Sequence, residues 1–130
     1  MKFEHFALNV PDARAMARWY IDHLGLRIAR QMEVAPYTSF LADDTGRVIM
    51  EIYTRTDAVI PDYASANPLC FHVAFVSEDN DVIRAKLVAA GADKGFEDTM
   101  PDGSRLMMLR DPWGIPIQFC RRAKPFGAVS

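Results

Sequence analysis

Two histidines and two side chains with oxygen donors recur at matching places in this 130-residue chain. His5 and Glu51 are separated by 46 positions, and so are His72 and Gln118. Two imidazoles, one carboxylate and one amide oxygen form a mixed nitrogen and oxygen donor set. Such a set suits zinc, nickel, cobalt, manganese or ferrous iron. The spacing therefore predicts one divalent metal ion held by His5, Glu51, His72 and Gln118.

The sequence around each of these residues also repeats, with an offset of 67 positions between the two copies. Glu-His-Phe-Ala-Leu at 4–8 matches Phe-His-Val-Ala-Phe at 71–75, and Met-Glu-Ile at 50–52 matches Ile-Gln-Phe at 117–119. A single histidine in a strand is more often a hydrogen-bonded packing residue than a ligand, and a single Glu or Gln usually faces water. The recurrence at symmetric positions is what favours ligands.

Elements that position these residues follow from the apolar periodicity. Alternating apolar residues predict strands near 3–10, 26–34, 37–42 and 47–54. Helical spacing after Pro11 predicts a helix that Asp12 caps and Gly25 ends. In each strand that carries a candidate ligand, the large apolar residues occupy one face. The polar residue therefore points to the opposite face, toward a cleft.

A linker rich in turn-forming residues follows at 55–68, and the pattern then starts again. Strands are predicted at 69–76 and near 94–98, 104–110 and 115–121, with a helix over 79–90 that turns Val82, Ile83, Leu87 and Ala90 inward. The predicted fold class is therefore α+β, with two tandem βαβββ modules. Module one covers about 1–54, module two about 69–122, and 123–130 form a tail. The alternative is one α+β sheet whose repeated spacing is a coincidence.

Composition limits the classes of partner and the location. Net charge is −2 with no large block of one sign, so nucleic acid is not an expected partner. The chain has no apolar run long enough for a membrane span and no signal peptide pattern, which favours a cytoplasmic protein. Cys70 and Cys120 lack metal-binding spacing and are expected to be reduced and packed, although Cys120 shares a strand face with Gln118.

These segments resemble the vicinal oxygen chelate superfamily, which includes glyoxalase I, methylmalonyl-CoA epimerase, extradiol dioxygenases and the fosfomycin- and bleomycin-resistance proteins. The resemblance rests on the four ligand segments and on the Asp-Pro-Trp-Gly turn at 111–114, and it covers nearly all of 1–122. It implies one glyoxalase/bleomycin-resistance-like domain whose paired modules form a half-open mixed β-barrel cleft with the helices outside. It also implies one divalent metal, a small-molecule substrate and a homodimer.

One departure from the family pattern concerns Gln118, because isomerising and chelating members usually have Glu there. An amide is an uncharged, weaker oxygen ligand and cannot accept a proton at working pH. Glu51 is then the only anionic ligand and the remaining candidate for a general base. We expect the site to hold metal less tightly but to polarise a bound oxygen more strongly.

The resemblance leaves several activities open. The leading expectation is a metal-dependent isomerase or lyase that binds a small substrate through vicinal oxygens and proceeds by an enolate or enediolate. A second is a non-catalytic resistance-type protein that sequesters a small molecule or antibiotic without metal. A third is a ring-cleaving dioxygenase-like oxygenase, in which His5, His72 and Glu51 form the metal triad. A degenerate partner subunit that keeps only the fold is a further alternative.

Overall fold

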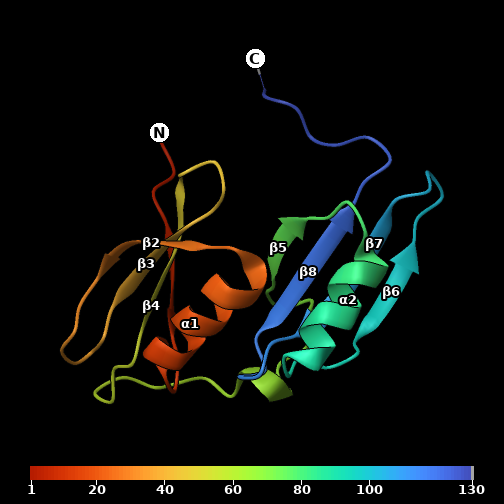
Figure 1. Cartoon of the computed structure of the whole chain (residues 1–130). Coiled ribbons are helices and arrows are strands. Elements are labelled where there is room, and N and C mark those ends of the chain that lie inside the picture. Colours follow the sequence, from red (N-terminus) through yellow and green to blue (C-terminus); the bar gives the residue numbers. More distant parts are fainter. Residues whose placement is uncertain (130) are drawn as a thin grey trace. The chain divides into compact units, whose positions relative to one another are not determined.

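The computed structural model of the chain describes residues 1–129, so Ser130, the last residue of the expected tail, lies outside the described part. The chain divides into two compact units, one over Met1–Pro61 and one from Asp62 onward. Both units contain a helix and a four-stranded sheet within the described residues (Figure 1).

In the first unit, the elements are β1 (Phe6–Asn9), α1 (Ala13–Leu24), β2 (Arg27–Gln31), β3 (Ser39–Ala42) and β4 (Val48–Tyr53). The sheet has the order β1-β4-β3-β2. The first and last strands pair in parallel, and the other neighbours are antiparallel. The first unit is therefore one βαβββ module.

The second unit begins with the short helix η1 (Tyr63–Ser65). It continues with β5 (Val73–Val76), α2 (Asn80–Ala89), β6 (Phe96–Thr99), β7 (Arg105–Arg110) and β8 (Pro116–Arg121). Its strand order, β5-β8-β7-β6, repeats that of the first unit, again with a parallel pair of first and last strands. The predicted α+β class with two βαβββ modules is confirmed.

The strand register repeats as well as the strand order. In the first unit Ala7 is paired with Glu51, and in the second unit Ala74 is paired with Gln118. These partners are offset by the same 67 positions as the sequence motifs. Because side chains alternate across a strand, the equal register places Glu51 and Gln118 on equivalent faces of their sheets.

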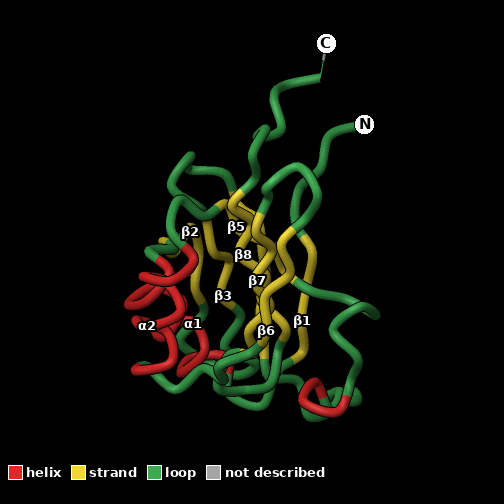
Figure 2. Tube along the Cα trace, turned by 90° about the vertical axis from the view of Figure 1, so that its right-hand side faces the viewer, coloured by secondary structure: helices red, strands yellow, loops and turns green. Residues whose placement is uncertain are grey.

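Both helices begin at an aspartate cap. The Asp12 carboxylate accepts a hydrogen bond from the Ala15 backbone N–H at 3.0 Å, and Asp79 does the same for Asp81 and Val82. Helix α1 ends at Gly25, whose φ of 72° lies in the left-handed region. Each helix contacts two strands of its own sheet and covers one face of it (Figure 2).

The two helices are held differently. Helix α1 buries an apolar stripe formed by Ala13, Met16, Ala17, Trp19 and Tyr20. In α2, Leu87 is buried but Val82 is 64% exposed, so the prediction that Val82 faces inward is wrong. The helix turns Asn80 and Arg84 toward the sheet instead, where both donate hydrogen bonds to the Glu97 carboxylate.

A strand was predicted over 69–76, but β5 begins only at Val73, so the predicted strand was too long at its start. The Asn67 side chain accepts a hydrogen bond from the Leu69 backbone N–H at 2.8 Å, and its carbonyl accepts one from Cys70 at 2.9 Å. This turn takes the backbone away from the extended conformation. His72 consequently lies in the connection that leads into β5, as His5 lies just before β1.

Candidate functional site

In the first unit, β1 and β4 bring the candidate ligands His5 and Glu51 together. His5 Nε2 lies 3.1 Å from Glu51 Oε2, and the two side chains are 28% and 20% exposed. The edge of the Phe40 ring packs against the imidazole, with centroids 5.5 Å apart and an interplanar angle of 86°. The pair is therefore half-buried and held on an apolar support.

Hydrogen bonding shows which nitrogen of His5 is available. Nδ1 contacts Glu4 Oε1, and an ionised carboxylate only accepts, so Nδ1 carries the hydrogen of this contact. Nε2 then faces Glu51 Oε2, and either a hydrogen or a cation has to lie between these two electron-rich atoms. Two ligands on adjacent corners of an octahedron, with bonds of about 2.1 Å, would be about 3.0 Å apart. The observed separation of 3.1 Å fits two ligands of one cation and equally fits a direct N–H···O hydrogen bond.

In the second unit, His72 and Gln118 occupy the equivalent places. His72 Nδ1 lies 2.9 Å from the Pro68 carbonyl oxygen and donates to it, which leaves Nε2 with the lone pair that a metal ligand needs. Gln118 is half-buried in β8, and its Oε1 accepts a hydrogen bond from the Cys120 thiol at 3.3 Å. Among residues 1–129, the His72 and Gln118 side chains share no hydrogen bond.

The types of side chain present fit a divalent metal, but the oxygen donor is charged in the first unit and neutral in the second. The first unit supplies an imidazole nitrogen and a carboxylate oxygen that already converge. The second supplies an imidazole nitrogen with a fixed tautomer and an amide oxygen. Within the described chain, no group of three or more His, Cys, Asp or Glu side chains forms a metal site. Each unit offers one imidazole nitrogen and one side-chain oxygen as candidate donors.

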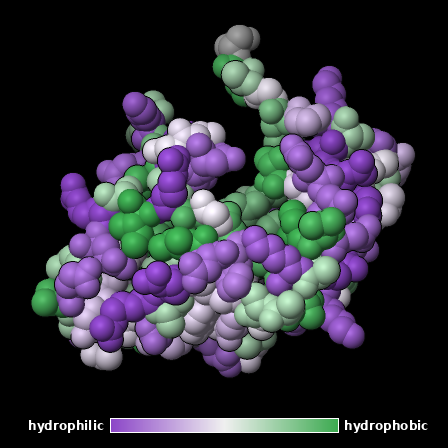
Figure 3. Space-filling model, viewed as in Figure 1, coloured by the Kyte–Doolittle hydropathy of each residue, from purple (hydrophilic) through white to green (hydrophobic). Residues whose placement is uncertain are grey.

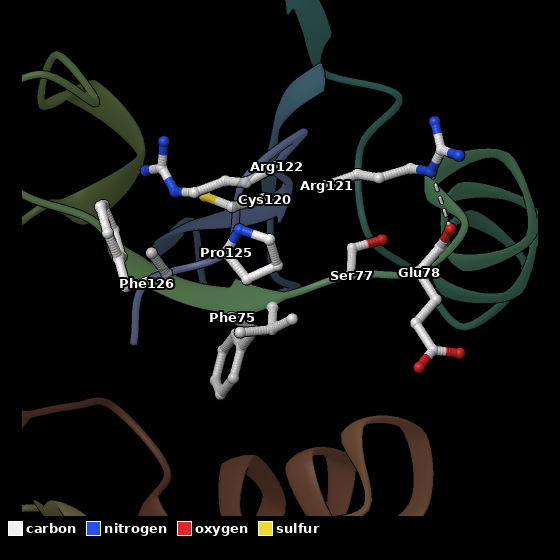
Figure 4. A pocket seen from close by; sticks show the side chains of 10 residues that line it. Phe75, Ser77, Glu78, Cys120, Arg121, Arg122, Pro125 and Phe126 are labelled. Atoms are coloured by element: carbon white, nitrogen blue, oxygen red, sulfur yellow. Dashed lines mark hydrogen bonds between the residues drawn. The ribbon is translucent and has the colours of Figure 1, made fainter. Parts of the chain in front are cut away.

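A groove of about 630 Å³ lies beside the Gln118 position in the second unit (Figure 4). Its wall comes from β5, the end of β8 and the segment after β8. Cys120 lines the groove and also donates its hydrogen bond to Gln118, so the two features share one side chain. The sequence indicated this only through the shared strand face of Cys120 and Gln118.

Both cysteines and Arg105 lie outside the four candidate ligands. Both cysteines are reduced, as expected; Cys120 is buried, but Cys70 is exposed, so the packing prediction was wrong for Cys70. Burial raises the pKa of the Cys120 thiol, and the neighbouring Arg122 guanidinium opposes that shift. Arg105 forms ion pairs with Glu97 and Asp81, which makes it a structural residue of the second unit.

The chain belongs to the Glyoxalase/Bleomycin resistance protein/Dioxygenase superfamily, whose sequence profile it matches over residues 2–119. This agrees with the fold and with the repeated placement of the four candidate ligands. No curated protein matches the sequence.

Several solved structures share the fold. A glyoxalase-related enzyme from Fulvimarina pelagi superposes with a TM-score of 0.71 at 19% identity, covering 98% of this chain and 94% of that chain. A lactoylglutathione lyase from Agrobacterium tumefaciens gives 0.65 at 20% identity, covering 92% of each chain. TioX from Micromonospora sp. ML1 gives 0.65 at 22% identity, covering 93% of this chain and 98% of that one. At these identities, the similarity establishes the fold alone.

Among the described residues, no helix has the length and apolar character needed to cross a membrane.

Proposed function

We propose that the protein is a metal-dependent enzyme of the glyoxalase type, an isomerase or lyase that acts on a small substrate bound through two neighbouring oxygens. His5, Glu51, His72 and Gln118 are the proposed ligands of one divalent ion. The observation that carries the proposal is the 3.1 Å approach of His5 Nε2 to Glu51 Oε2, on a strand register that recurs around Gln118. When bound, the ion would supply Lewis-acid stabilisation of negative charge that develops on the substrate oxygens.

The proposed ligands are oriented by the chain's own groups. The Glu4 carboxylate accepts a hydrogen bond from Nδ1 of His5, and the Pro68 carbonyl accepts one from Nδ1 of His72. In both histidines Nε2 is then the nitrogen whose lone pair can bind a metal. These contacts fix the ring orientation before any ligand arrives, which lowers the ordering cost of binding. The Phe40 edge contact adds a steric limit to rotation of the His5 ring.

Glu51 is the proposed general base. Its Oε2 faces His5, and its Oε1 has no hydrogen-bond partner among residues 1–129, so this oxygen is available to a substrate proton. The side chain is 20% exposed, which reduces competition from water. Gln118, at the equivalent position, cannot accept a proton, and the proposal therefore assigns proton transfer to the first unit alone.

Metal content of histidine variants tests the proposal. The sequence has three histidines, and the ring of His23 on α1 packs against Trp19 at an interplanar angle of 57°, so His23 provides a matched control. We expect one equivalent of a divalent metal in the purified protein and in His23→Ala, and loss of that metal in His5→Ala and His72→Ala, by elemental analysis after mild purification. A metal-free wild-type protein whose melting temperature does not respond to chelator would reject the metal enzyme.

A second candidate function is the sequestration of a small molecule without turnover. The groove beside Cys120 favours it, because a mostly apolar concavity needs no catalytic group to bind a ligand. The metal-content experiment separates the two candidates. The family resemblance also supports a cytoplasmic homodimer, for which light scattering would give twice the chain mass of 14.6 kDa.

A further inference from the structure

The groove in the second unit exposes apolar side chains that a folded protein usually covers. Its wall includes Phe75, Val76, Pro125 and Phe126. Val76 is 86% exposed and Phe126 is 84% exposed. Figure 3 shows apolar surface over β5, below the C-terminal tail. The volume of about 630 Å³ is within the usual range for small-molecule sites, so a small ligand with an apolar body matches the space.

A cation stands at one end of this groove. The Arg122 guanidinium lies over the Phe126 ring, 4.5 Å from its centroid, and both residues line the groove together with Cys120. No carboxylate among residues 1–129 lies within ion-pair distance of Arg122. The pKa of the Asp102 carboxyl is lowered mainly by hydrogen bonds from Ser104 and to a smaller extent by the Arg122 charge, so Arg122 is influenced by one carboxylate from a longer distance. The planar guanidinium can donate two parallel hydrogen bonds to a carboxylate.

The neighbouring arginine is engaged differently. Arg121 Nε donates a hydrogen bond to the Glu78 carbonyl oxygen at 3.0 Å. In Figure 4, Arg121 lies at the Glu78 end of the groove, whereas Arg122 lies at the Phe126 end. The Glu78 carboxylate at the first end disfavours an anion there, since like charges repel. The groove therefore has one preferred end for a negative charge.

We propose that this groove binds a small carboxylic acid with an aromatic or branched apolar body. Its carboxylate pairs with Arg122, and its body packs against Phe75, Val76 and Phe126. Because Cys120 both lines the groove and contacts Gln118, acids of this kind are also the substrate class we assign to the enzyme. That assignment rests on the proposed function, whereas the binding itself does not.

The test uses 4-phenylbutyrate and its uncharged amide as probes, with the full-length protein and titration calorimetry. Neither probe has oxygens on two adjacent carbons, so neither can form the chelate proposed for the substrate, and the His5→Ala variant reports whether the carboxylate itself binds at the metal ligands. We expect saturable binding of the acid, about tenfold tighter than that of the amide, because a hydrogen bond between charged groups is stronger than one to a neutral group. In Arg122→Gln the acid should weaken about tenfold and become equal to the amide.

Three variants make the result specific. Arg121→Gln is the matched control and should leave the acid's dissociation constant within about twofold, because a group outside the contact contributes little. Arg122→Lys keeps the positive charge but lacks the two parallel N–H donors of the guanidinium, so it should retain part of the preference for the acid. His5→Ala, which removes a proposed metal ligand, should bind the acid as the wild type does, so loss of the metal and loss of the groove are separable.

Other outcomes would overturn the proposal. Equal affinity for acid and amide would exclude Arg122 as an anion site, and an equal loss in Arg121→Gln would make the effect a general one of surface charge. Loss of acid binding in His5→Ala would place the carboxylate at the metal ligands. If the acid shows no saturable binding, or if its binding is coupled to dissociation of a dimer, a second copy of the chain or no ligand occupies the groove.

Discussion

The two modules share a strand register but hold their helices and their candidate ligands by different physical means. Helix α1 rests on an apolar stripe, whereas α2 is joined to its sheet by Asn80, Arg84 and the Glu97 carboxylate. Apolar packing has no directional requirement, but a half-buried ionic cluster stabilises only when each partner is present. The two modules thus share a backbone frame but differ in the chemistry inside it.

The same divergence affects the candidate ligands. The first module pairs an imidazole with a carboxylate at 3.1 Å, and the second offers an imidazole and an amide that bond to other groups. Negative charge in the donor set therefore comes from Glu51 alone. If the proposed metal site exists, metal affinity should depend far more on the first module than on the second.

The largest effect on stability is expected at Glu97. Its side chain is 12% exposed and binds Arg84 at 3.1 Å and Arg105 at 2.6 Å, so Glu97→Ala leaves two arginines without this partner. We expect a loss of about 2–3 kcal/mol in the free energy of unfolding, reduced from the fully buried case because both arginines are partly exposed. Urea titration measures it. A loss below about 1 kcal/mol would show that the ionic attachment of α2 is not needed.

The next prediction exchanges the oxygen donors of the two modules. Glu51→Gln removes the only anionic ligand and should weaken metal binding about 100-fold, at the upper end of the effect of losing a supporting partner. Gln118→Glu adds a second carboxylate and should tighten binding about tenfold, because charge attraction strengthens in a half-buried site. Competition with a chelating dye measures both constants. Equal and small changes at the two positions would contradict the asymmetry between the modules.

The smallest effect concerns an exposed ion pair and its pH dependence. Hydrogen bonds from Arg105 lower the pKa of Asp81 below its ordinary value of 3.8. A carboxyl group with a depressed pKa adds stability above that ordinary value, and the contribution is lost as pH falls through the folded-state pKa. Compared with wild type at the same pH, Asp81→Asn should therefore have a slightly lower melting temperature at neutral pH, and this difference should shrink as the pH falls below 3.8. A difference that persists in acid would exclude this pair as its cause.

Much of this fold could be predicted from local patterns. Alternating apolar residues indicated β4 and β8, which carry Glu51 and Gln118. Asp12 and Gly25 marked the ends of α1, because caps depend on neighbouring residues only. The orientation of α2 could not be found this way. Val82 fits an apolar stripe, but the helix is turned by bonds to Glu97, which lies on a different element. Likewise, the delayed start of β5 depends on a side-chain turn at Asn67 that alternation does not reveal.

The candidate site was predictable only in part. The repeat pointed to His5, Glu51, His72 and Gln118, and the equal registers around Glu51 and Gln118 agree with the equal offsets. The role of these four residues as ligands of one metal stays a prediction. The groove was not predicted, since it depends on how the segment with Pro125 and Phe126 passes over β5. No periodicity describes such a segment, and its position comes from tertiary contacts.

Anomalous diffraction at the absorption edge of the bound metal tests the central claim most directly. Our account predicts a single peak with Nε2 of both His5 and His72 and one oxygen each of Glu51 and Gln118 at about 2.0–2.2 Å. A peak coordinated by other residues, or crystals of metal-supplemented protein with no peak near His5 and Glu51, would contradict it.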